Sequence, residues 1–140
     1  EKMADAVTSQ TLSDGDRIAV MKFTNISDGT GESSVAKVDV SALAASNAGL
    51  TPALVTIEQI WYDVGGMRVA LEWNATTNVV AAVVGGSAAA GPDSGHMDFR
   101  SFGGIKNTLA SGYNGDIDLT THGHTNHDHY TVVLQLRKSY

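Results

Sequence analysis

The sequence predicts an all-β domain, an antiparallel β-sandwich or barrel of the jelly-roll-like kind, with about eight to nine strands and little helix. Three observations predict this class. Glycine is frequent, at 15 of 140 residues, whereas proline occurs only twice. β-branched residues recur in short runs, and turn signals separate these runs about every 8 to 12 residues, as in sandwiches and barrels. The length suits a single β-domain over residues 1–140, without a linker.

Three strands are predicted in the N-terminal part of the chain, at residues 7–12, 17–26 and 35–40. The uninterrupted apolar centre of the second strand indicates burial on both of its faces. The third strand alternates, so that Lys37 and Asp39 point away from its apolar side. A single helical turn capped by Ser41 is expected over residues 41–45.

A hairpin is predicted in the middle of the chain, with strands over residues 54–64 and 67–74. Gly65 and Gly66 readily supply the positive φ angles of the two-residue turn between them. This register gathers the apolar side chains on one face and sets Asp63 opposite Arg68 as a cross-strand charge pair. Trp61 then lies on the other face, where either a second sheet covers it as part of the core or it stays exposed as an anchor for a partner.

Two more strands and a closing hairpin complete the predicted fold. The single strands are expected over residues 79–84 and 97–105, with loops over residues 85–95 and 106–114. The closing hairpin pairs residues 116–122 with residues 129–137, and Leu119 with Val132, because each strand alternates cleanly. The glycine pairs at 85–86 and 103–104 are interpreted as tight turns or points of close backbone approach.

Four of the five histidines, His122, His124, His127 and His129, fall within eight residues at the tip of the closing hairpin. Imidazole is a common ligand of divalent metals, and the predicted register makes His122 and His129 cross-strand neighbours. Three interpretations remain open: a solvated loop that binds no physiological metal, an intersubunit site on an oligomer axis, and a divalent metal site within one chain. Asp116 and Asp118, on the polar face of the same strand, could complete such a site.

Composition excludes several classes of function. The net charge of −6 at pH 7 leaves no basic stripe for nucleic acid, and the absence of cysteine removes thiolate chemistry. No apolar run reaches the length of a membrane span, so no membrane partner is expected. No nucleophile elbow, P-loop or dinucleotide-binding fingerprint occurs, so we expect no enzyme activity and no other cofactor.

Several phrases carry a resemblance: residues 4–10 (ADAVTSQ), 20–32 (VMKFTNISDGTGE), 73–77 (WNATT) and 98–105 (DFRSFGGI). They resemble small virion structural proteins of tailed bacteriophages, particularly marine ones. The resemblance implies a non-enzymatic particle component that is made in the host cytoplasm. It implies most directly a capsid decoration (cement) protein, a homo-oligomer and most simply a trimer, that binds the major capsid protein on the outer surface of the virion.

The residues add a mechanism for that role. Residues 1–12 read as an extended N-terminal arm that adds as an edge strand to a neighbouring molecule, with Val7 and Leu12 filling pockets there. Val7, Leu12 and Trp61 are therefore the candidate partner-binding residues. Two alternatives remain: a neck, tail or fibre-associated virion protein, and a soluble metal- or carbohydrate-binding β-domain.

Overall fold

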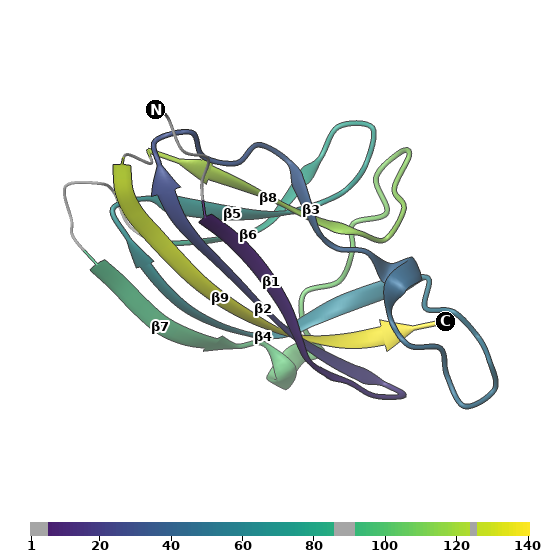
Figure 1. Ribbon diagram of the computed structural model, residues 1–140. Helices are drawn as coiled ribbons and strands as arrows, with labels where there is room; N and C mark the ends of the chain where they lie inside the picture. The colour runs from purple at the N-terminus through teal and green to yellow at the C-terminus, as the bar shows by residue number, and fades with distance from the viewer. Residues whose placement is uncertain (1–5, 86–91, 124–125) are drawn as a thin grey trace.

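The computed structural model describes residues 6–85, 92–123 and 126–140, and in this part of the chain nine strands form two antiparallel sheets (Figure 1). The five-stranded sheet has the order β1 (Ala6–Asp14), β2 (Ile18–Asp28), β9 (Asn126–Ser139), β4 (Leu54–Gly65), β7 (Pro92–Asp98). The four-stranded sheet has the order β3 (Val35–Val38), β8 (Ile117–His122), β5 (Arg68–Trp73), β6 (Val79–Val84). The described part of the chain also contains two short helical turns, η1 (Val40–Ala42) and η3 (Arg100–Phe102). No helix in the described ranges is long and apolar enough to cross a membrane. The predicted all-β sandwich is confirmed.

The pairing pattern is that of one long hairpin folded over on itself. Strand β2 pairs with β9, β3 with β8, β4 with β7, and β5 with β6, all antiparallel. Contacts between β4 and β9 and between β5 and β8 then close the two four-stranded sheets of a jelly roll. Strand β1 stands outside this eight-stranded core, as an extra edge strand beside β2.

The core lies between the inner faces of the two sheets. Strand β2 shows how alternation works here, because Phe23 is fully buried whereas Ile26 is 60% exposed. Burial on both faces was expected from the apolar centre of β2, and it is met only in part: Ala19 is buried, whereas Ile18, Val20 and Met21 are half-buried. The largest buried side chains come from both sheets: Phe23, Ile57, Ile60, Tyr130, Leu134 and Leu136 from one, and Leu71, Trp73, Ile117 and Leu119 from the other.

The predicted central hairpin does not form, because β4 and β5 lie in different sheets. Asp63 is opposite Ser94 and Thr131, whereas Arg68 is opposite His122, so the two charges are not cross-strand neighbours. The turn itself is where the sequence placed it, and Gly66 has a φ of +79°. A Cβ atom at Gly66 would collide with the Asp128 carboxylate, so glycine is required in this turn, where the chain passes from one sheet to the other.

The predicted closing hairpin is wrong for the same reason. Strand β8 belongs to the four-stranded sheet and β9 to the five-stranded sheet. Leu119 and Val132 are both fully buried, as their alternation indicated, but they enter the core from opposite sheets. In a jelly roll most consecutive strands cross between sheets, so alternation identified the buried face but not the hydrogen-bonded partner.

The chain between β6 and β8 also departs from the prediction. Strand β6 has the predicted bounds, but β7 begins at Pro92, inside the expected loop, of which residues 86–91 lie outside the described part. The strand expected over residues 97–105 ends at Asp98, because the turn η3 follows. Gly103 and Gly104, with φ of +90° and +87°, then return the chain to Ile57, and a Cβ atom at Gly104 would lie 2.6 Å from Thr56 Cγ2. This pair is the predicted point of close backbone approach.

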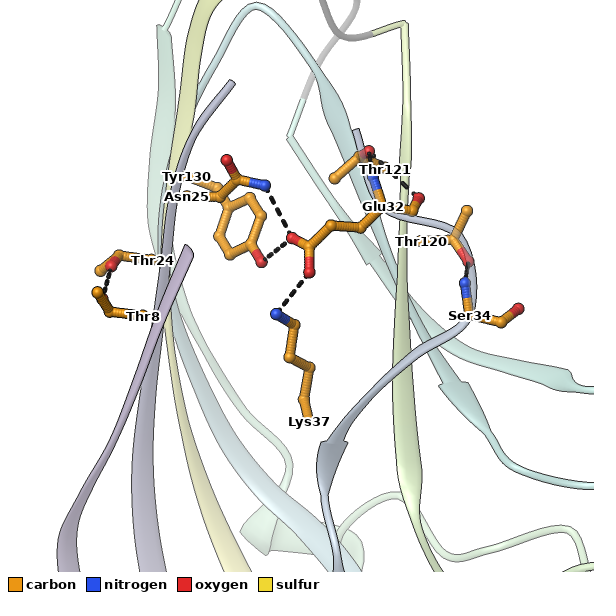
Figure 2. Close-up of polar contacts among 9 residues, drawn as sticks. All are labelled: Thr8, Thr24, Asn25, Glu32, Ser34, Lys37, Thr120, Thr121 and Tyr130. Atoms are coloured by element: carbon orange, nitrogen blue, oxygen red, sulfur yellow. Dashed lines mark hydrogen bonds and ion pairs between the residues drawn. The ribbon is translucent and has the colours of Figure 1, made fainter. Parts of the chain in front are cut away.

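Lys37 points into the protein, contrary to the prediction. The register of β3 on β8 shifts between Ala36 and Val38, and this bulge turns the Lys37 side chain inward, where 3% of it is exposed. Its Nζ atom lies 2.5 Å from Oε2 of the buried Glu32 (Figure 2). The helical turn after β3 is η1, and its cap is Asp39 instead of Ser41: the Asp39 carboxylate accepts the Ser41 amide.

Glu32 ties the two sheets together beside β2. Its Oε1 atom accepts hydrogen bonds from Tyr130 Oη at 2.5 Å and from Asn25 Nδ2 at 2.8 Å, both on the five-stranded sheet (Figure 2). Its backbone pairs with Thr121 of the four-stranded sheet, through hydrogen bonds of 2.9 and 3.0 Å. A charge in the core is tolerable only when it is paired and hydrogen-bonded, and Glu32 meets both conditions.

Candidate interaction surfaces

The structure separates the two histidines of the tip whose side chains it describes. His122 ends β8 opposite Arg68, in the four-stranded sheet, whereas His129 lies on β9 opposite Gly65 and Ile26, in the five-stranded sheet. The His129 ring lies against Gly65, where a Cβ atom would collide with it. The two are therefore not the cross-strand pair that the predicted hairpin required. His124 and the side chain of His127 lie outside the described residues.

The acidic residues expected beside the tip lie at the far end of β8 from His122. Asp118 accepts hydrogen bonds from Asn74 Nδ2 at 2.8 Å and Asn78 Nδ2 at 2.9 Å, which hold the turn between β5 and β6. Asp116 accepts the Val40 amide at 3.0 Å. In the described part of the chain, no group of three or more His, Cys, Asp or Glu side chains is arranged to hold a metal ion. Asp116 and Asp118 are therefore engaged in other contacts, and metal binding by the four histidines stays a prediction, because His124 and the side chain of His127 lie outside the described residues.

We expect Asp116→Asn to stabilise the protein at neutral pH. Burial raises the pKa of Asp116, and the charges of Asp39 and Asp118 raise it further, while the Val40 amide opposes them. A raised pKa in the folded state means that the ionised form costs stability once the pH exceeds that pKa. The asparagine Oδ1 can still accept the Val40 amide.

Thermal unfolding at pH 7 should give a higher Tm for Asp116→Asn than for the unmodified protein. The difference should vanish when the pH falls below the ordinary carboxyl value of 3.8, because Asp116 is then protonated in both states. An equal or lower Tm at pH 7 would contradict this account of Asp116.

Strand β1 is the most exposed element of the fold. Eight of its nine residues are exposed, and the ninth, Asp14, is intermediate. Val7 and Leu12 are 39% and 48% exposed, and Leu12 sits where the register on β2 shifts between Thr11 and Ser13. From Ala6 onward the predicted arm is a strand, and its residues 1–5 lie outside the described part of the chain. The strand pairs with β2 of its own chain, and its second edge pairs with no strand in the described ranges.

Polar contacts hold β1 in place along its length. Thr8 and Thr24 share a short hydrogen bond between their hydroxyl groups (Figure 2). At the far end the Asp14 carboxylate pairs with the buried Lys138 ammonium, which also donates to the backbone carbonyls of Gly15 at 2.6 Å and Ala44 at 2.9 Å. These contacts preorganise β1 as an edge strand, so a partner would not have to order it on binding.

The four sheet edges differ in how they are protected against pairing with another chain. Strand β7 begins at Pro92 and carries Asp93 and Asp98, and β3 has only four residues and a bulge. Proline, charge, short length and bulges all discourage edge-to-edge pairing. Strand β6 is apolar and bulged. Strand β1 is also bulged, at Leu12, but it is longer than β6 and carries no charge before Asp14. β1 is thus the longest edge without a charge along most of its length.

Trp61 lies on the outer face of the five-stranded sheet, so of the two alternatives for this residue the core position is wrong. Its side chain is half-buried and stacks on His96 of β7, with ring centroids 4.8 Å apart and an angle of 7° between the planes. Trp61 and His96 are cross-strand neighbours in the register of β4 on β7. Strands β2 and β9 separate Trp61 from Val7 and Leu12, so the three candidate partner-binding residues do not form one surface.

Sequence reasoning did not associate the residues around Trp61. The predicted hairpin set Trp61 opposite Ala70, whereas its real neighbours are His96 on β7 and Val133 on β9. These residues are far apart in the sequence, and no local pattern links them. The comparisons with known proteins add no further residues: no family model, no curated protein and no solved structure matches this chain significantly.

Proposed function

We propose that this protein is a non-enzymatic structural component of a virus particle, a decoration protein that binds the outer surface of the capsid through β1. The observation that carries the proposal is the geometry of β1, a preorganised edge strand that is exposed on both faces. The resemblance of residues 4–10 and 20–32, which include parts of β1 and β2, to virion structural proteins supplies the partner, the major capsid protein. Jelly rolls occur in capsid proteins and in lectins, so the fold by itself is compatible with the role without establishing it.

Strand addition explains how such a surface would bind. The unpaired edge of β1 offers main-chain hydrogen bonds to an extended segment of the capsid protein, while Val7 and Leu12 offer apolar side chains for pockets. The net charge of −6 favours the outer side of the shell over the side that faces packaged DNA. A trimer would carry three copies of this weak contact. Once one copy has bound the capsid lattice, the other two bind at a high effective concentration, so the overall affinity rises.

The test is a double substitution on β1 together with a matched substitution on another edge. Val7→Lys/Leu12→Lys adds charges to β1, whereas Val80→Lys/Val83→Lys makes the same change at exposed positions of β6. Neither double substitution should alter the free energy of unfolding by more than about 1 kcal/mol, because all four substituted side chains are exposed. Binding to purified, expanded and undecorated heads should weaken about tenfold or more for the β1 variant only, as expected for a charged edge.

Equal affinities of the two variants for heads would overturn the role of β1. Absence of any binding by the unmodified protein would overturn the decoration role itself. Deletion of residues 1–12 is a poorer test than substitution, because eight residue pairs join β1 to β2 and the deletion would remove part of the domain's own sheet. Electron microscopy of labelled particles separates decoration from a neck, tail or fibre position, and sedimentation of the free protein tests the trimer.

A further inference from the structure

The outer face of the five-stranded sheet carries a second feature, at the opposite edge from β1. A hollow of about 280 Å³, which we call the Trp61 hollow, lies over β9, β4 and β7. Its volume is near the lower end of the range for small-ligand sites. The residues that line it are Trp61, Tyr62, Asp63, Ser94, Gly95, Thr131 and Val133.

Trp61 lines the hollow, and the orientation of its side chain is fixed before any ligand arrives. Trp61 stacks on His96, and His96 Nε2 lies 2.8 Å from Gln59 Oε1. Gln59 Nε2 in turn donates to Gln135 Oε1 at 2.9 Å. Because the indole is already stacked on a ring that this chain of hydrogen bonds holds, a ligand would lose little free energy to order it.

The neighbouring row of the sheet supplies the polar part of the hollow. Asp63 on β4 is opposite Ser94 on β7 and Thr131 on β9, so three hydrogen-bonding side chains form one row across three strands. Between residues 6 and 140, excluding the undescribed 86–91 and 124–125, none of these three side chains makes a hydrogen bond or ion pair with the protein. Their hydrogen-bonding capacity is therefore available to a ligand.

We propose that the Trp61 hollow binds a saccharide, with a pyranose ring against Trp61 and its hydroxyl groups on Asp63, Ser94 and Thr131. A pyranose has a face of C–H groups that suits a flat aromatic wall, and a rim of hydroxyl groups that both donate and accept. The carboxylate of Asp63 accepts such hydrogen bonds, and the hydroxyl groups of Ser94 and Thr131 can do either. The inference goes beyond capsid decoration, and the two are separable because β2 lies between β1 and the strands β9, β4 and β7 that carry the hollow.

The experiment titrates the purified protein with the methyl glycosides of glucose, galactose, mannose and N-acetylglucosamine, followed by saturation-transfer NMR and tryptophan fluorescence. Trp73, the other tryptophan, is 1% exposed in the core, so a fluorescence change on binding reports on Trp61. We expect at least one glycoside to bind. Trp61→Ala and Asp63→Ala should each weaken that binding by about tenfold or more.

The matched control is Tyr113→Ala, which removes another partly exposed aromatic side chain, 46% exposed, from a loop outside the hollow. It should leave glycoside binding unchanged. Asp63 is exposed, so Asp63→Ala tests the site even where Trp61→Ala perturbs the sheet. The proposal is overturned if no glycoside of the panel binds, or if Asp63→Ala binds the glycoside as tightly as the unmodified protein does. It is also overturned if a simple ammonium ion binds in the hollow while the glycosides do not, because the hollow would then be a site for cations beside Asp63 and Trp61.

Discussion

Lys37→Met is expected to lower the free energy of unfolding by about 3–5 kcal/mol, the usual cost of removing one member of a buried ion pair. The substitution leaves the Glu32 carboxylate in the interior, with only the neutral donors Asn25 and Tyr130 to compensate its charge. The Glu32 side chain is 5% exposed, so water cannot replace the ammonium without opening the contact between the sheets. Denaturant unfolding followed by circular dichroism measures the change.

The double variant Glu32→Gln/Lys37→Met should recover much of this loss. Its side chains are neutral, and glutamine can still accept a hydrogen bond from Asn25 or Tyr130 through its carbonyl oxygen. Lys106→Met is the matched control, because Lys106 is exposed and surface substitutions change stability by about 0.5 kcal/mol or less. A loss below about 1 kcal/mol for Lys37→Met would show that the pair does not hold the sheets together.

Gly115→Ala is expected to be the most damaging glycine substitution, with a loss of about 3 kcal/mol or more. Gly115 is buried just before β8 and has a φ of +88°, a conformation that side chains rarely adopt. A Cβ atom there would collide with the carbonyl oxygen of Ala53 and lie 3.1 Å from Val40 Cγ2. Relief would require a shift of the backbone itself, because the colliding atom is not part of a flexible side chain.

Gly49→Ala separates this collision from the cost of the backbone angle alone. Gly49 has nearly the same φ, +81°, but a Cβ atom added there would have no neighbouring atom within 4 Å. The free energy of unfolding of Gly49→Ala should therefore fall only by the cost of the left-handed backbone conformation, about 1–2 kcal/mol. Similar losses for the two variants in denaturant unfolding would mean that the approach of Ala53 to Gly115 relaxes at no cost.

Much of the candidate surface could be read from the sequence, but its grouping could not. The strand character of the N-terminal segment follows from its local alternation, and the structure agrees with it. Val7 and Leu12 are both exposed because no described residue covers either face of β1. The pairing of that segment with β2 depends on the rest of the sheet. The row of Asp63, Ser94 and Thr131 comes from three strands that are distant in the sequence, so no local pattern could associate it with Trp61.

The fold class, most of the strands and the buried face of most of them follow from the sequence alone, because an alternation of period two is a property of each strand. The tertiary structure decided which strands pair. Residues 54–64 and 67–74 alternate as hairpin strands do, yet a strand that packs its apolar face on the opposite sheet shows the same pattern. The tertiary structure also decided the fate of Lys37 and Trp61. A bulge turned the lysine inward, whereas the tryptophan stayed on the outer face because no layer formed by the described residues covers it; burial depends on what packs against a strand.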